Sequence, residues 1–153
     1  MENENAFKNL INAKVVQKYL SVHCKDKKEI NKVTLKLNDL ELRARVQLIA
    51  NELKNYLDAD FTKAIKQLVQ ITRSQKMRSF ELWPATEFIQ IYGLNHIEES
   101  FEVMQELTPK FIAEFCIRPF INRHGPVIYK KLHKLKTHPD EHIRRWVSEG
   151  TRP

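Results

Sequence analysis

Glycine is scarce in this sequence, with three residues in 153, and the alternation of β-branched and polar residues that is typical of strands is absent. Apolar residues recur instead at steps of three and four, which predicts an all-α fold. So few glycines exclude a P-loop and a dinucleotide-binding glycine pattern, and no Ser-His-Asp constellation is visible. We therefore expect a helical protein that uses no cofactor.

Long apolar runs and cysteines are also few. No run approaches the roughly 20 residues that span a bilayer, and the N-terminal stretch MENENAFKNL lacks the basic and apolar regions of a secretory signal. The two cysteines, Cys24 and Cys116, are far apart, which favours reduced thiols in or near the core over a disulfide or a catalytic cysteine. Residues 1–153 have the length and composition of one folded domain, expected in the cytoplasm without a membrane partner.

Positive charge is concentrated near the C-terminal end. Residues 1–108 carry 16 Lys and Arg against 15 Asp and Glu, whereas residues 109–153 carry 10 against 4. A local excess of this kind is typical of a surface that meets a polyanion.

Helical periodicity and capping residues predict a series of helices. The first ones expected are about Ala6 to Val22, Lys27 to Leu35, LELRARVQLIANELKNYL after a capping box of Asn38 and Glu41, and FTKAIKQLVQITRS capped by Asp60. The later ones start at Trp83-Pro84 (ending before Gly93), at Asn95, at Thr108-Pro109, after a break at Gly125-Pro126, and at His138-Pro139. Short connections between such helices predict antiparallel neighbours, stacked as in HEAT or armadillo repeats; a plain helical bundle is the alternative.

The basic residues of the last two helices fall on defined faces. In the first of them the apolar face contains Ile128, Leu132 and Leu135, and the basic residues are Lys130, Lys131 and Lys134. In the last helix Ile143 and Val147 face inward beside Trp146, and Arg145, Glu149 and Arg152 share the other side. These are either solvated faces with an Arg145–Glu149 pair or a phosphate-binding surface, and the repetition on two helices favours phosphate binding.

Glu114 is unusual because it lies among apolar residues in FIAEFCIRPF. Either its carboxylate points to solvent, or it lies near a reacting cation whose developing charge it stabilises. Arg118 lies four residues on, so it can pair with Glu114 and reach the same surface, and Pro119 is expected to kink the helix.

The segment HPDEH matches the zinc-peptidase pattern H-x-x-E-H. Pro139 places His138 outside the helical register, so Asp140 and Glu141 are interpreted as first-turn acids and no metal is expected.

Three segments together resemble the AlkC branch of the AlkC/AlkD DNA alkylation-repair glycosylases: ELWPATEFIQIYGL, ELTPKFIAEFCIRPFINRH and HPDEHIRRWVSEGTRP. The stretch NDLELRARVQLIANEL followed by LDADFTKAIKQL is similar to the family's N-terminal helices. The resemblance implies HEAT-like repeats curved around duplex DNA, and hydrolysis of the N-glycosidic bond of cationic bases such as 3-methyladenine or, for AlkC-type members, 3-methylcytosine. Members of this family leave the damaged base in the duplex, unlike most enzymes of base chemistry.

Residue by residue, the resemblance implies that Glu114 and Glu149 lie near the lesion. It places Arg145 and Arg152 at the DNA backbone, with Arg144 and Arg118 in support. In the family the SEG-x-R-P block continues into R-L-P-W, and later helices supply the catalytic aspartate. We therefore expect residues 1–153 to hold half of the site and to lack the C-terminal repeats. The glycosylase activity of this chain is then in question. An uncapped terminal repeat is also expected to expose an apolar face through which the chain can self-associate.

Two other functions compete with excision of alkylated bases. A non-catalytic scaffold of the same fold predicts DNA binding that depends on salt and ignores lesions. A helical-repeat protein that binds acidic proteins or RNA predicts that RNA competes with duplex DNA.

Overall fold

The computed structural model describes residues 7–111 and 113–153, and this part of the chain contains helices and no strand. The α-helices are α2 (Ala13–Leu20), α3 (Lys27–Lys36), α4 (Leu42–Tyr56), α5 (Phe61–Ser74), α6 (Trp83–Tyr92), α7 (Ile97–Leu107), α8 (Glu114–Lys134) and α9 (Glu141–Gly150). Two 3-10 helices, η1 (Leu37–Asp39) and η2 (Ser79–Leu82), precede α4 and α6. The predicted all-α fold is confirmed.

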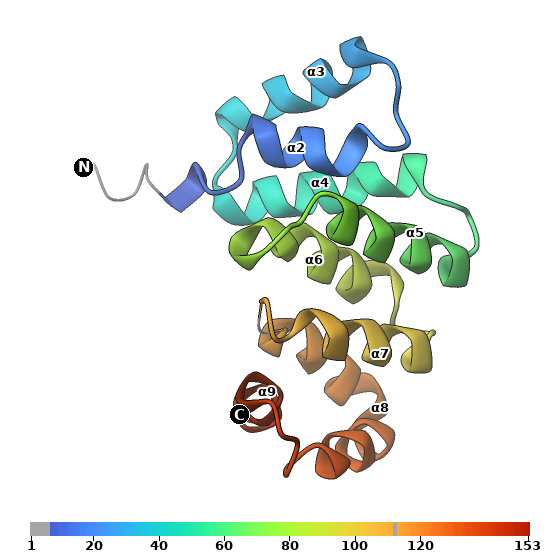
Figure 1. The fold of residues 1–153 in the computed structure, drawn as a ribbon, viewed down its shortest axis with the longest axis vertical. Helices are drawn as coiled ribbons and strands as arrows, with labels where there is room; N and C mark the ends of the chain where they lie inside the picture. Colours follow the sequence, from blue (N-terminus) through green and yellow to red (C-terminus); the bar gives the residue numbers. More distant parts are fainter. Residues whose placement is uncertain (1–6, 112) are drawn as a thin grey trace.

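The helices stack as successive hairpins along the long axis of the molecule, from α2 and α3 near one end to α8 and α9 at the other (Figure 1). Helix α6 packs on α4 and on α8 in one layer, and α5 packs on α7 in the other. Helix α9 packs on α8 at the C-terminal end. This is the helical-repeat arrangement that the short connections predict.

Several helix boundaries follow directly from capping residues. The carboxylate of Asp60 accepts a hydrogen bond from Lys63 N at the start of α5, as predicted. Helix α6 begins at Trp83 with Pro84 in its first turn and ends before Gly93, also as predicted. Asp140 is the N-cap of α9, where it accepts bonds from the backbone of His142 and Ile143, and Glu141 is the first-turn acid. His138 and Pro139 lie just before that helix.

Two predictions in the N-terminal third are wrong. The single helix expected from Ala6 to Val22 is interrupted, because the Asn12 side chain accepts bonds from Lys14 N and Val15 N and starts α2 at Ala13; Ala6 itself lies outside the described residues. The capping box of Asn38 and Glu41 does not form. Asn38 lies within η1, and Glu41 is the N-cap of α4 without a capping bond from its side chain.

The start of the helix that carries Glu114 also differs from the prediction. Instead of beginning at Thr108-Pro109, α8 begins at Glu114, because the Thr108 hydroxyl donates to Met104 O at 2.7 Å and closes the end of α7. Phe111 N then donates to Leu107 O within the turn that follows. Glu114 is therefore a first-turn residue rather than a mid-helix one. Helix α7 begins at Ile97, two residues after the predicted Asn95.

Helix α8 bends at His124, whose backbone angles (φ −131°, ψ 31°) are not helical. The bend directly precedes Gly125-Pro126, where the sequence predicts a break, because proline cannot donate the helical hydrogen bond and crowds the preceding turn. Pro119 lies inside the helical part, so the kink expected there is found five residues later. His124 Nε2 lies 2.7 Å from Leu94 O and fixes the bend against the end of α6.

The core runs through all the layers. The predicted apolar stripe of α4 is confirmed: Val46, Ile49, Leu53 and Leu57 are buried, and Leu42 is partly buried. Cys24 and Cys116 are both buried and unpaired, in agreement with the prediction of core thiols. Among the described residues, no helix combines the length and the apolar character needed to cross a membrane.

Candidate functional site

Three hollows adjoin one another on the surface formed by α6, α8 and α9, which we call the three-hollow surface. The aromatic hollow, of about 420 Å³, lies between the start of α6, the start of α8 and α9. The central hollow, of about 370 Å³, shares Trp83 and Phe115 with it. The terminal hollow, of about 430 Å³, shares Arg118 and Asn122 with the central one and extends along residues 150–153.

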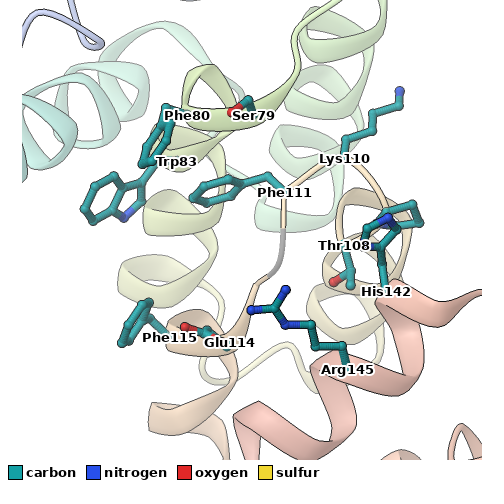
Figure 2. A pocket seen from close by; sticks show the side chains of 11 residues that line it. Ser79, Phe80, Trp83, Thr108, Lys110, Phe111, Glu114, Phe115, His142 and Arg145 are labelled. Atoms are coloured by element: carbon teal, nitrogen blue, oxygen red, sulfur yellow. The ribbon is translucent and has the colours of Figure 1, made fainter. Parts of the chain in front are cut away.

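Three aromatic rings form one wall of the aromatic hollow (Figure 2). The ring centroids of Phe80, Trp83 and Phe111 lie 5.9 to 6.4 Å from one another. These separations are in the range of favourable tilted contacts, so the three rings support one another and form an apolar wall.

Glu114 and Arg145 lie opposite this wall. Figure 2 shows the Arg145 guanidinium and the Glu114 carboxylate directed to the same hollow, from α9 and from α8. Within the described residues neither side chain takes part in an ion pair within 4.0 Å. Glu114 is the first residue of α8, where a negative charge interacts favourably with the positive end of the helix dipole. The hollow thus offers a negative and a positive group beside an aromatic wall.

The pair of Arg118 with Glu114 that the helical spacing allows does not form in this structure. Its guanidinium carbon lies 5.1 Å from the centroid of the Phe115 ring, a cation-π contact. Phe115 itself is 60% exposed. The Nε atom of Arg118 is buried and has no hydrogen-bond partner in the described part of the chain. Arg118 therefore lies between the central and terminal hollows with a donor still to be satisfied.

Glu149 pairs with Arg152, with Oε2 at 3.1 Å from Nη1, and not with Arg145, the partner that the solvated-face alternative gave it. Arg145 therefore lines the aromatic hollow without an ion-pair partner among the described residues, and Arg152 lines the terminal hollow. The two arginines that were predicted to share a side of α9 thus lie at two different hollows of one surface.

The remaining predicted basic residues have other surroundings. Arg144 Nη1 donates to His138 O at 2.7 Å and to Pro139 O at 2.9 Å, which holds the turn before α9. Lys131 forms an ion pair with Glu98 of α7 and lies over the Phe101 ring. Lys130 and Lys134 are exposed, and neither lines one of the three hollows. The lysines of α8 are therefore not part of the three-hollow surface.

The two histidines of HPDEH have separate roles. His138 lies outside α9, as predicted, and its Nδ1 accepts a hydrogen bond from Asp140 N at 3.0 Å. His142 lies on α9 and lines the aromatic hollow. No group of three or more potential metal ligands is found among residues 7–111 and 113–153.

Sequence reasoning missed the aromatic wall and one buried acid. Phe80 and Phe111 come from a 3-10 helix and a turn, so no periodicity links them. Trp83, Glu87 and Gln90 do carry a signal, because their spacing of four and three residues places them on one face of α6. Glu87 is only 5% exposed and lines the central hollow. Burial mainly, and the Glu87 charge in addition, raise the pKa of the nearby Cys116 thiol.

The chain is similar to the uncharacterized protein YhaZ of Bacillus subtilis (strain 168), with 32% identity over 123 residues. The similarity covers 78% of this chain and 34% of that protein, so the chain spans about a third of the length of this curated relative. No model of a known protein family matches the sequence, and no solved structure matches it.

Proposed function

We propose that this chain is part of an AlkC-type DNA alkylation-repair protein and that it binds duplex DNA across the three-hollow surface. The observation that supports the proposal is the placing of Glu114 and Arg145 at one aromatic hollow, with Arg118 and Arg152 at the two adjoining ones. These four residues are separated by up to 38 positions in the sequence, and they lie in the segments that carry the family resemblance.

The arginines would contact the DNA backbone. Arg145 of α9 and Arg152, two residues beyond the end of that helix, are exposed, and Arg118 comes from α8. Guanidinium groups bind phosphate oxygens in a fixed two-pronged geometry, which orients a duplex without selecting its sequence. Arg144, which is bonded to two backbone carbonyls, would act indirectly by holding the turn that positions α9.

The carboxylates would act on the sugar of the damaged nucleotide. In N-glycosidic hydrolysis the bond from C1′ to the base nitrogen breaks, and its electron pair neutralises the cationic base. A water oxygen then bonds to C1′ and gives up a proton. A carboxylate near the deoxyribose stabilises the oxocarbenium-like transition state and can accept that proton. Glu114, which has no ion-pair partner among the described residues, is suited to this role.

A non-catalytic DNA-binding scaffold is the second candidate, and the pairing of Glu149 favours it. The Arg152 guanidinium already compensates the Glu149 charge at 3.1 Å. A paired carboxylate stabilises a developing cation less well than an unpaired one, because its neighbour repels the same charge. On this alternative the chain holds DNA and performs no chemistry.

Release of free base from duplex DNA containing 3-methyladenine tests the proposal. The wild-type chain would be compared with Glu114→Gln and Glu149→Gln. Glu102→Gln, a change of an exposed residue on α7, is the control. Release that falls with the first two variants and not with the control supports catalysis. Duplex binding without release supports the scaffold, and absence of both binding and release would reject both candidates.

A further inference from the structure

Glu87 is a buried carboxylate with spare capacity to accept hydrogen bonds. It lies in the middle of α6 and is 5% exposed. Its Oε1 accepts from Gln47 Nε2 at 3.4 Å, a long bond and the single one to its carboxylate within the described residues. Burying a carboxylate is costly unless donors surround it. Because Glu87 lines the central hollow, the donors that it lacks can come from an occupant of that hollow.

Arg118 lines the same hollow and has hydrogen-bond donors without acceptors among residues 7–111 and 113–153. Its Nε–H is buried without an acceptor in the described part of the chain, although its guanidinium is fixed against the Phe115 ring. Buried donors in native structures nearly always have a partner. The terminal N–H groups of Arg118 also have no partner among the described residues, so one occupant that donates to Glu87 and accepts from these groups would pair with both side chains.

The rest of the lining favours a flat, neutral molecule. Trp83, Phe115 and Pro119 supply apolar surface, and Gln90 and Asn122 supply amides. The volume of about 370 Å³ is sufficient for one ring system. Stacking on aromatic side chains and arginine planes is the usual way in which proteins hold single bases.

The mixed charge of the lining favours a neutral occupant inside the hollow over a charged one. A phosphate would be attracted by Arg43 and Arg118 but repelled by Glu87, which lines the same hollow. An ammonium group would be attracted by Glu87 but repelled by the two arginines. A neutral nucleobase with donors and acceptors on one edge is repelled neither by Glu87 nor by the two arginines.

Among the bases, guanine fits best. Its Watson–Crick edge carries two adjacent donors, N1–H and N2–H, which match the two oxygens of a carboxylate. Beside them O6 is an acceptor for Arg118. Adenine, cytosine and thymine each offer a single donor group on this edge.

We propose that the central hollow binds one unpaired guanine, with Glu87 accepting from N1–H and N2–H and the terminal N–H groups of the Arg118 guanidinium donating to O6. In a duplex this edge is occupied by cytosine, so the guanine must be unpaired. The source can be a single-stranded stretch of DNA or a free guanine nucleotide. The inference goes beyond the proposed function, since duplex and lesion binding do not require it.

Fluorescence of Trp83 provides the test. The chain has two tryptophans, and Trp146 is fully buried with its Nε1–H bonded to Ala113 O, so quenching by a stacked base reports on Trp83. Oligothymidylates of seven nucleotides with a central dG, dA, dC or dT would be titrated, together with guanosine monophosphate. We expect the dG oligonucleotide to bind about tenfold more tightly than the others, as for one bidentate base contact.

Glu87→Gln should abolish the preference for dG over the other three oligonucleotides, whereas the Glu102→Gln control keeps the preference. Preferential binding of guanosine monophosphate as well would identify the free base as sufficient, and preference confined to oligonucleotides would identify DNA as the source. Equal affinity for all four oligonucleotides in the wild-type chain overturns the inference, even if Glu87→Gln fails to fold.

The test also separates this inference from the proposed function. Duplex binding without a base preference removes the guanine site alone. A dG preference without duplex binding removes the duplex-binding function and leaves the guanine site in place.

Discussion

Gly150 lies directly against Ile117: a Cβ atom added to this glycine would come within 2.7 Å of Ile117 Cγ2. The glycine is the last residue of α9, and Ile117 is a fully buried residue of α8. The close approach determines how α9 packs on α8. It therefore determines where Arg145 and Arg152 lie relative to Glu114 and Arg118.

Gly150→Ala is expected to destabilise the fold by about 1–3 kcal/mol, the usual cost of overpacking a core. The branched Ile117 side chain is enclosed on all sides, so it cannot move away freely. Gly125→Ala is the matched control, since the added Cβ would meet Tyr129 ring atoms at 3.8 Å, an ordinary contact. Urea unfolding of both variants measures the difference, and equal stabilities would show that the α8–α9 interface adapts.

Arg45 is expected to matter for stability and not for binding. It is buried, and its guanidinium donates to the carbonyls of Leu40 (2.8 Å), Lys8 (3.1 Å) and Ile11 (3.1 Å). Arg45→Ala leaves these buried acceptors unsatisfied and should cost roughly 2–4 kcal/mol. Arg43→Ala, two residues earlier on the exposed side of α4, should change the free energy of unfolding by less than about 0.5 kcal/mol. A loss of similar size in both variants would contradict this account.

Much of the fold could be predicted from the sequence because local signals decide it. The stripe of Val46, Ile49 and Leu53 and the caps at Asp60 and Pro84 depend on neighbours a few positions away. The wrong boundaries arose where two local signals compete. Asn12 interrupts a helical pattern by binding the backbone ahead of it. At Thr108 a hydroxyl bonded to Met104 O ends one helix where Thr-Pro had predicted the start of another.

The site was less predictable because its contacts join distant segments. Spacing along α8 allowed Arg118 to pair with Glu114, yet the guanidinium lies over Phe115 instead. Spacing along α9 allowed Arg145 to pair with Glu149, yet Glu149 pairs with Arg152. The partner of Lys131 is Glu98 on another helix, 33 positions away. A helical pattern gives the candidates for pairing, and only the packing of helices selects among them.

Arg145→Ala should reduce the salt dependence of duplex binding if Arg145 contacts a phosphate. Each lost phosphate contact lowers the slope of log K against log salt by about 0.9 on double-stranded DNA. Arg73→Ala removes the same charge from α5, where the side chain pairs with Glu106 on a different face of the molecule, and should leave the slope unchanged. Titrations at four salt concentrations measure both. An identical slope for wild type and Arg145→Ala would exclude a phosphate contact there.

The thiol of Cys116 should resist alkylation in the folded chain. Burial, and in lesser part the Glu87 charge, raise its pKa well above the ordinary value, and its Sγ–H donates to Thr86 O at 3.1 Å. Because the thiolate is the reactive form, a raised pKa lowers the reactive fraction at every pH up to that pKa. In a Cys24→Ala background we expect Cys116 to react with iodoacetamide at pH 8.5 at least about a hundredfold more slowly in buffer than in 8 M urea, because the folded chain both lowers the thiolate fraction and encloses the sulfur. Glu87→Gln should lower the pKa of Cys116, which would shift the onset of the reaction of the folded protein to lower pH.

Rapid alkylation in buffer at pH 8.5 would mean that α6 and α8 separate often enough to expose the thiol, and such opening would also disrupt the central hollow between them.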